Sequence, residues 1–173
     1  HADGFDAFAS PNYPCLMEAG INIHLKAGEI SSGHIQPLTV ATINPQPIGI
    51  VTLYPGITTS LIENFLHQPI KALILLTYGV GNAPQNPALL DCLSKANERG
   101  IILVNLTQCL QGKVNMEGYA TGNALAQAGV ISGFDMTTEA ALAKLHYLMS
   151  KPYSAEQIRE AMQKNLVGEL SES

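Results

Sequence analysis

Three near-continuous runs of β-branched residues and leucine constrain the fold of this 173-residue chain more than any other feature. They read IGIVTLY at 48–54, ALILL at 72–76 and IILVNL at 101–106. Apolar runs without polar alternation are typical of strands that are buried on both faces, as in parallel sheets. The three runs therefore predict three strands in the interior of an α/β domain.

Segments with helical periodicity fill the intervals between these runs. The segment 58–69, TTSLIENFLHQP, offers Thr59 or Ser60 as N-cap, and the segment 87–98 has Asn86 as N-cap before Pro87. The side chains expected to be buried are Leu61, Ile62, Phe65, Leu66, Leu89, Leu90 and Leu93. Short joints between strands and helices predict right-handed crossovers. We therefore expect a three-layer, open, mainly parallel sheet with helices on both faces.

The carboxyl-terminal part of the chain predicts two more helices. Thr137 is an N-cap candidate for the first, and Ser154 with Gln157 forms a capping-box pattern before the second. The apolar residues expected on their inner faces are Ala141, Leu145, Leu148, Ile158, Met162 and Leu166. These two helices should cover the sheet.

The sequence before the first buried run has a different character. Residues 1–20 are rich in Gly, Ala, Pro, Asp and Asn, and we interpret them as an interdomain linker. INIHL at 21–25 alternates and predicts a half-buried strand, and LTVATI at 38–43 predicts another. The expected organisation is a linker, 1–20, followed by a single α/β domain, 21–173.

Charge and cysteine usage narrow the expected ligand. The net charge is −5 and Lys and Arg form no cluster, which argues against nucleic acid or an anionic membrane as partner. Cys15, Cys92 and Cys109 have irregular spacing that fits neither a disulfide framework nor a metal motif, so we expect buried thiols in a reducing compartment. No apolar run approaches the ~20 residues that span a bilayer. The sequence thus predicts a soluble domain without metal or cofactor that binds a small neutral or zwitterionic ligand.

One predicted loop is a candidate ligand site. TYGVGNAPQNP at 77–87 leaves the carboxyl end of a central predicted strand, the edge where open parallel sheets bind ligands. Gly79 and Gly81 would let the main chain approach a ligand closely, and the Asn82 amide both donates and accepts hydrogen bonds. Asn and Gly are also common turn residues, so spacing alone leaves a structural turn as an equal alternative.

A second loop, TQCLQGKV at 107–114, follows the neighbouring strand. Thr107, Gln108 and Cys109 should therefore lie at the same sheet edge as the first loop. The residues show no complete catalytic motif: a nucleophilic elbow, a zinc-protease helix and a P-loop are all missing from the sequence. From the residues alone, the chain is expected to bind rather than to catalyse.

Long segments, in order, resemble one family. HADGFDAFASPN, PQPIGIVTLYPG, KALILLTYGVGNAPQNP, GIILVNLTQC, GKVNMEGYATGNALAQAGVI and DMTTEAALAKLHYLMS are similar to the carboxyl-terminal part of bacterial cytoplasmic (type I) L-asparaginases. The resemblance covers essentially the whole chain. It implies a cytoplasmic homodimer or dimer of dimers that hydrolyses L-asparagine, with L-glutamine as the alternative substrate.

The resemblance also implies that the chemistry lies outside this chain. In the family, a separate amino-terminal α/β domain carries the threonine nucleophile and a second threonine beside an aspartate and a lysine, and none of those motifs occurs here. No catalytic residue is therefore expected in this chain, and residues 1–173 alone should be inactive. YGVGN matches the family element that reaches the neighbouring subunit's active site, which assigns substrate positioning to Asn82 and Gly81.

Two features leave alternatives open. Some relatives add an acidic residue from a later loop, but the corresponding YATGNAL has none, and Asn123 is a weak candidate to replace it. Type I relatives can carry an allosteric asparagine site in this domain, for which Thr107, Gln108 and Cys109 are the candidates. Besides an asparaginase domain, the chain is compatible with a regulatory amino-acid-binding module or with the same domain of an asparaginase-like tRNA-amidotransferase subunit.

Overall fold

The computed structural model describes residues 9–13, 15–26, 39–116, 118 and 120–171. The chain divides into two compact units, His1–Ala41 and Thr42–Ser173. The described part of the first unit contains an antiparallel hairpin of β1, Met17–Ala19, and β2, Ile23–Leu25, with Met17 opposite Leu25.

The hairpin agrees only in part with the prediction for 21–25. The strand exists over Ile23–Leu25, but its expected half-burial is wrong, because every residue of β1 and β2 is exposed. A two-stranded ribbon has no second layer of its own to cover either face. No local pattern predicted β1, which is only three residues long.

The second unit is built on a four-stranded sheet with all strands parallel. The strands are β3, Ile48–Thr52; β4, Ala72–Thr77; β5, Ile102–Thr107; and β6, Val130–Ser132. Their order in the sheet is β3-β4-β5-β6, the same as their order in the chain. In this register Ile50 lies beside Ile74, which lies beside Val104. Three of these strands match the three buried runs of the sequence.

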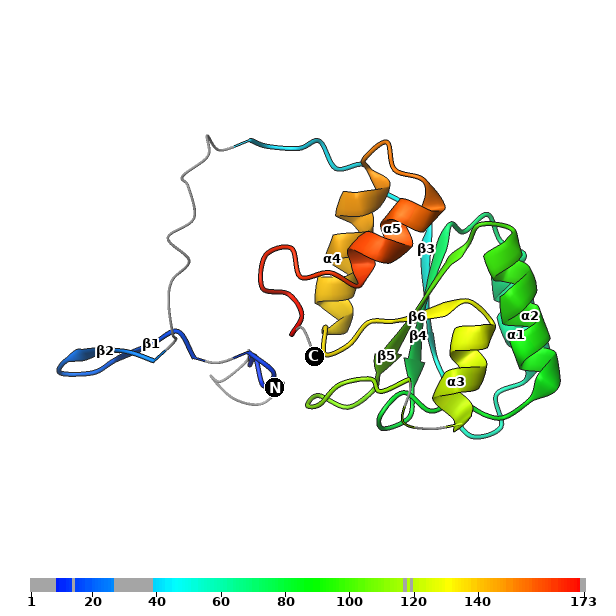
Figure 1. Ribbon diagram of the computed structural model, residues 1–173, viewed down its shortest axis with the longest axis horizontal. Helices are drawn as coiled ribbons and strands as arrows, with labels where there is room; N and C mark the ends of the chain where they lie inside the picture. The colour runs from blue at the N-terminus through cyan, green and yellow to red at the C-terminus, as the bar shows by residue number, and fades with distance from the viewer. Residues whose placement is uncertain (1–8, 14, 27–38, 117, 119, 172–173) are drawn as a thin grey trace. The chain divides into compact units, whose positions relative to one another are not determined.

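Connecting helices cover one face of this sheet (Figure 1). They are α1, Thr59–Leu66; α2, Pro87–Glu98; and α3, Ala120–Gln127. Because each new strand is added on the same side of the last, right-handed crossovers place all three helices on the same face. Asn86 caps α2 as predicted, since its side chain accepts the Ala88 N–H at 3.0 Å.

The opposite face is covered by α4, Thr138–Met149, and α5, Ala155–Met162 (Figure 1). Both N-caps are confirmed: Thr137 accepts the Ala140 N–H at 3.1 Å, and Ser154 and Gln157 form the complete capping box. The three-layer α/β architecture is therefore confirmed.

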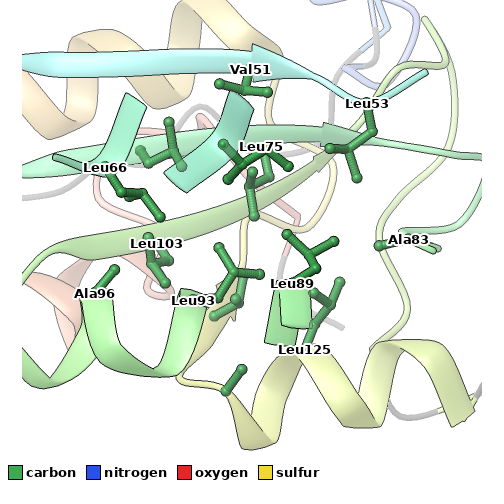
Figure 2. Packing of buried hydrophobic residues seen from close by; sticks show 14 of the residues in the cluster. Val51, Leu53, Leu66, Leu75, Ala83, Leu89, Leu93, Ala96, Leu103 and Leu125 are labelled. Atoms are coloured by element: carbon green, nitrogen blue, oxygen red, sulfur yellow. The ribbon is translucent and has the colours of Figure 1, made fainter. Parts of the chain in front are cut away.

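Side chains of the central strands alternate between two apolar clusters. On β4, Leu73 and Leu75 pack toward α1 and α2, whereas Ala72 and Ile74 pack toward α4 and α5. Figure 2 shows the first cluster, in which Leu75 and Leu103 of the sheet face the helical Leu89 and Leu93. Burial on both faces explains why these strands read as continuous apolar runs.

Several boundaries differ from the predictions. Thr58, rather than Thr59 or Ser60, is the N-cap of α1, and Leu61 is exposed. Leu166 lies beyond the end of α5 and is 45% exposed, because its N–H binds the Glu169 carboxylate in a turn instead of continuing the helix. Leu90 is only half-buried. The short α3 and β6 were not predicted.

The strand expected at 38–43 is wrong for residues 39–43, which form none; Leu38 lies outside the described residues. Val40 is 89% exposed. Further along, the Asn44 and Gln46 N–H groups bind Ser150 Oγ at 3.0 Å and His146 Nδ1 at 3.2 Å, at the end of α4. Side chains thus satisfy backbone groups here, and Pro45 and Pro47 have no N–H for a sheet ladder.

Candidate functional site

The loop after β4 is a tight, closed turn at the carboxyl edge of the sheet. The N–H of Tyr78 donates to the Asn82 oxygen and the N–H of Asn82 donates to the Tyr78 oxygen, each over 2.8 Å. The Gly81 N–H adds a third bond to the Tyr78 oxygen at 3.0 Å. The main chain of Asn82 is therefore fixed from both of its hydrogen-bonding groups.

This turn requires glycine for two different reasons. Gly79 has a φ of 50° and Gly81 a φ of 103°, both in the region that side chains disfavour. A Cβ on Gly81 would also lie 2.7 Å from Val114 Cγ1, whereas a Cβ on Gly79 would meet nothing within 4 Å. Gly81 is thus needed for conformation and for space, and Gly79 for conformation only.

A buried polar network under the turn holds it to the sheet. Thr77 Oγ1 donates to Asn105 Oδ1 at 2.6 Å, and Asn105 Nδ2 donates to the Gly81 oxygen at 3.0 Å. Both side chains are 0% exposed. Sequence reasoning missed this network, although Asn105 is a polar residue inside the otherwise apolar run IILVNL. A polar residue in a fully buried strand needs a hydrogen-bond partner, and that was the available signal.

The side chain of Asn82 points to α3. The Thr121 hydroxyl of that helix donates a hydrogen bond to Asn82 Oδ1, and the contact is partly buried. Asn123, the weaker sequence candidate, is exposed on the same helix, and among the described residues of α3 the side chain of Asn82 bonds Thr121 instead. Thr121 was not a candidate from the sequence.

Thr107, Gln108 and Cys109 lie at the same edge as the turn. The Thr107 hydroxyl donates to the Gly79 oxygen and accepts the Cys109 N–H at 3.0 Å. Gln108 Nε2 donates to the oxygens of Leu53 at 2.7 Å and Leu76 at 2.9 Å. Two of the three candidate side chains therefore use hydrogen bonds to tie strand ends and loops together, and the Cys109 thiol is exposed.

An open cavity of about 400 Å³ lies beside this edge. Its walls come from the loop before α3, from α3, from β6 and from the residue after α5; its polar and aromatic lining includes Lys113, Asn115, Asn123, Ser132, Phe134 and Gln163. Among the site candidates only Asn123 lines it.

Thiol and carboxylate chemistry in the described residues is sparse. Cys15, Cys92 and Cys109 are all free, and the expectation of buried thiols is wrong for the exposed Cys15 and Cys109. Burial, helped by the Glu63 carboxylate, raises the pKa of the half-buried Cys92 thiol. Among the described residues, no three His, Cys, Asp or Glu side chains lie together in a group that could hold a metal ion. Nor does any helix of the described chain have the length and apolarity to cross a membrane.

Residues 47–162 match the glutaminase/asparaginase C-terminal domain family. The chain belongs to this family. It is 63% identical over 172 residues to L-asparaginase 1 of Escherichia coli K12, which covers 99% of this chain and 51% of that protein. The chain thus spans about half the length of the curated relatives that it matches first.

Other members of the family carry different names. The 60 kDa lysophospholipase of Homo sapiens is 44% identical over 169 residues, which covers 96% of this chain and 29% of that protein. Among solved structures, L-asparaginase I from Vibrio cholerae superposes with a TM-score of 0.93 at 61% identity, covering 99% of this chain and 52% of that one. The family and the fold of the chain are therefore shown together.

Proposed function

We propose that this chain is the C-terminal domain of an L-asparaginase that hydrolyses L-asparagine to L-aspartate and ammonia. The 63% identity to the Escherichia coli enzyme over 99% of this chain is the observation that carries the proposal. L-Glutamine is the alternative substrate. The threonine nucleophile and its aspartate and lysine partners belong to the other half of such a protein, so residues 1–173 alone should release no ammonia.

The proposed role of the domain is to position substrate through Asn82, with Gly81 shaping the turn. An amide that positions a substrate must itself be held in place. The Tyr78 and Asn82 main chains bind each other twice at 2.8 Å, and buried Asn105 holds the turn from below. This rigidity supports a positioning role.

We further propose a homodimer or dimer of dimers in which this sheet edge meets a second subunit. Two apolar side chains beside the turn support a protein-covered edge: Val80 is 38% exposed and Leu110 is 83% exposed. Three free thiols support the cytoplasm as the compartment.

Two other functions remain as alternatives. A regulatory site at Thr107, Gln108 and Cys109 is the first; the hydrogen bonds that already occupy Thr107 and Gln108 count against it, whereas the exposed Cys109 thiol leaves it open. An asparaginase-like tRNA-amidotransferase subunit is the second alternative. The high identity to an asparaginase favours the asparaginase domain over this alternative.

The test uses the full-length protein that contains this chain. Ammonia release is measured with L-asparagine and L-glutamine for the unmutated protein, for Asn82→Ala and for the control Asn64→Ala, which changes an exposed residue of α1. Losing a hydrogen bond to a charged substrate group costs roughly 1.5–3 kcal/mol. We expect kcat/KM of Asn82→Ala to fall about 10- to 100-fold with an unchanged melting temperature. A lower melting temperature with normal kinetics would instead make Asn82 a structural turn residue.

A further inference from the structure

The hydrogen bond between α3 and the turn after β4 points to a residue that sequence reasoning missed. We infer that Thr121 is a positioning residue that fixes the orientation of the Asn82 amide, so that Asn82 offers N–H donors and recognises a carboxylate of the substrate. The inference rests on the proposed function, because it specifies how the same residue binds its ligand.

An asparagine side chain has two faces of opposite polarity. Its oxygen accepts hydrogen bonds and its nitrogen donates two, so an unrestrained amide can turn either face toward a ligand. The Thr121 hydroxyl donates to Asn82 Oδ1, which uses the acceptor face of the amide. The donor face, Nδ2, has no partner among the described residues.

Main-chain hydrogen bonds also fix the backbone of Asn82. Both of its backbone groups bind Tyr78, so the Cα and Cβ positions are set before a ligand arrives. Rotation of the side chain away from α3 would break the Thr121 bond. With backbone and oxygen both held, Nδ2 has a direction that is fixed in advance, which reduces the ordering cost of binding.

The free donor face selects the chemistry of the ligand group. Two N–H donors suit a carboxylate, which accepts hydrogen bonds, and do not suit an ammonium group, which has only donors. Lys113 lies two residues before Asn115, whose N–H binds the Val80 oxygen at 2.8 Å, so a cationic residue is on the segment that flanks the turn. The geometry therefore favours the carboxylate of an amino acid over its α-amino group.

Variants of Thr121 separate the effect of its hydroxyl group from the effect of its side-chain shape. In the full-length protein, Thr121→Val removes the hydroxyl, Thr121→Ser keeps it, and Thr42→Val is a matched control at an exposed threonine of the same unit. We expect Thr121→Val to lower kcat/KM for asparagine about tenfold, mainly through KM, and Thr121→Ser to restore most of it. On an Asn82→Ala background, Thr121→Val should add almost nothing, because it acts through Asn82.

Two ligands and one further variant test the preference for a carboxylate. Succinamate keeps the carboxylate and lacks the α-amino group, whereas 3-aminopropanamide keeps the amine and lacks the carboxylate. As inhibitors of asparagine hydrolysis, succinamate should bind about tenfold more weakly to Thr121→Val, and 3-aminopropanamide should bind with an unchanged inhibition constant. Asn82→Asp, which replaces the donor by a charged oxygen, should impair asparagine turnover more than Asn82→Ala does.

The outcomes separate this inference from the proposed function. An unmutated full-length protein that releases no ammonia from asparagine overturns both. Normal turnover with unchanged kinetics in Thr121→Val overturns the inference alone. Asparagine turnover by Asn82→Asp that is as high as that of Asn82→Ala, or higher, would contradict recognition of a carboxylate and also overturns the inference.

Discussion

Asn105 donates a hydrogen bond from its fully buried side-chain amide to the main-chain oxygen of Gly81 over 3.0 Å. This contact joins the centre of β5 to the turn that carries Asn82. Thr77 completes the arrangement by donating its hydroxyl proton to Asn105 Oδ1 at 2.6 Å, and the Thr77 hydroxyl oxygen also lies 3.1 Å from the Leu106 oxygen. The position of a surface turn is thus determined by polar groups in the interior of the sheet.

Removal of this amide should affect both stability and the turn. Asn105→Ala leaves the Gly81 oxygen without its buried donor, and an unsatisfied buried polar group costs roughly 1–3 kcal/mol. We expect the free energy of unfolding, measured by urea titration, to fall by about 2 kcal/mol, while Asn64→Ala changes it little. In the full-length protein kcat/KM should fall as well. An unchanged unfolding midpoint for Asn105→Ala would contradict the structural role assigned to the network.

The two glycines of the turn should respond differently to alanine. Gly79→Ala introduces only an unfavourable φ, which costs about 1 kcal/mol. Gly81→Ala adds a clash, because the new Cβ would lie 2.7 Å from Val114 Cγ1, and should cost about 3 kcal/mol in all. Melting curves of the two variants give the comparison directly. Equal losses would mean that Val114 moves aside without cost.

A buried ion pair gives the second unit a defined acid response. Lys144 Nζ lies 2.5 Å from Glu169 Oε1, and the two side chains are 3% and 11% exposed. Burial by itself would raise the pKa of Glu169, but hydrogen bonds from Lys144 and from the Val167 and Leu166 N–H groups outweigh it and lower the pKa to about 2. Because the folded pKa is below the ordinary value of 4.5, the pair contributes stability above pH 4.5 and loses it as the pH falls toward 2.

Glu169→Gln tests this pair. At pH 7 the variant leaves a buried ammonium without its counter-charge, so we expect a loss of about 3 kcal/mol in unfolding free energy. The difference from the unmutated protein should shrink as the pH is lowered from 4.5 toward 2. Glu160→Gln, which changes an exposed residue of α5, is the matched control. A difference that stays constant over this pH range would refute the assignment.

The regulatory alternative predicts a change in the shape of the rate curve. If asparagine binds at Cys109 and shifts the subunits toward an active arrangement, the rate should depend sigmoidally on asparagine. Cys109→Ala and Thr107→Ala should then flatten the curve toward a hyperbola without abolishing turnover, whereas Cys15→Ala should not. Cys109→Ala is the cleaner variant, because Thr107 also holds the Gly79 oxygen. Hyperbolic kinetics in the unmutated full-length protein, with one asparagine per subunit by calorimetry, would exclude the site.

The sequence predicted the elements that carry strong local signals. Continuous apolar runs predicted β3, β4 and β5, and N-cap residues followed by apolar stripes predicted α2, α4 and α5. By contrast, α3 contains Gly122 and Asn123 and has no apolar stripe of its own, and β6 has only three residues. Such elements form because their neighbours fix them, so a local pattern could not reveal them.

The candidate site was predictable as a place but not as a set of contacts. Short joints between strands correctly put Asn82 and Thr107 at one edge of the sheet. The partners of Asn82 depend on lateral register and on how α3 packs, neither of which is written in a spacing. No sequence pattern therefore indicated the contacts made by the hydroxyls of Thr77 and Thr121. The contact of Asn105 was indicated by its unusual position, a polar residue within a buried run.

The strand order β3-β4-β5-β6 has a consequence for synthesis of the protein on the ribosome. All three crossover helices cover one face, so the other face of the sheet stays bare until α4 and α5 have been made. That face includes Ile74, Ile102 and Val104, all fully or almost fully buried in the finished fold. At roughly 5–20 residues per second, the segment that covers it takes a few seconds to translate. A nascent chain that pauses before Thr138 would therefore expose an apolar sheet face to which chaperones can bind. Synthesis and packing of α4 and α5 end this exposure.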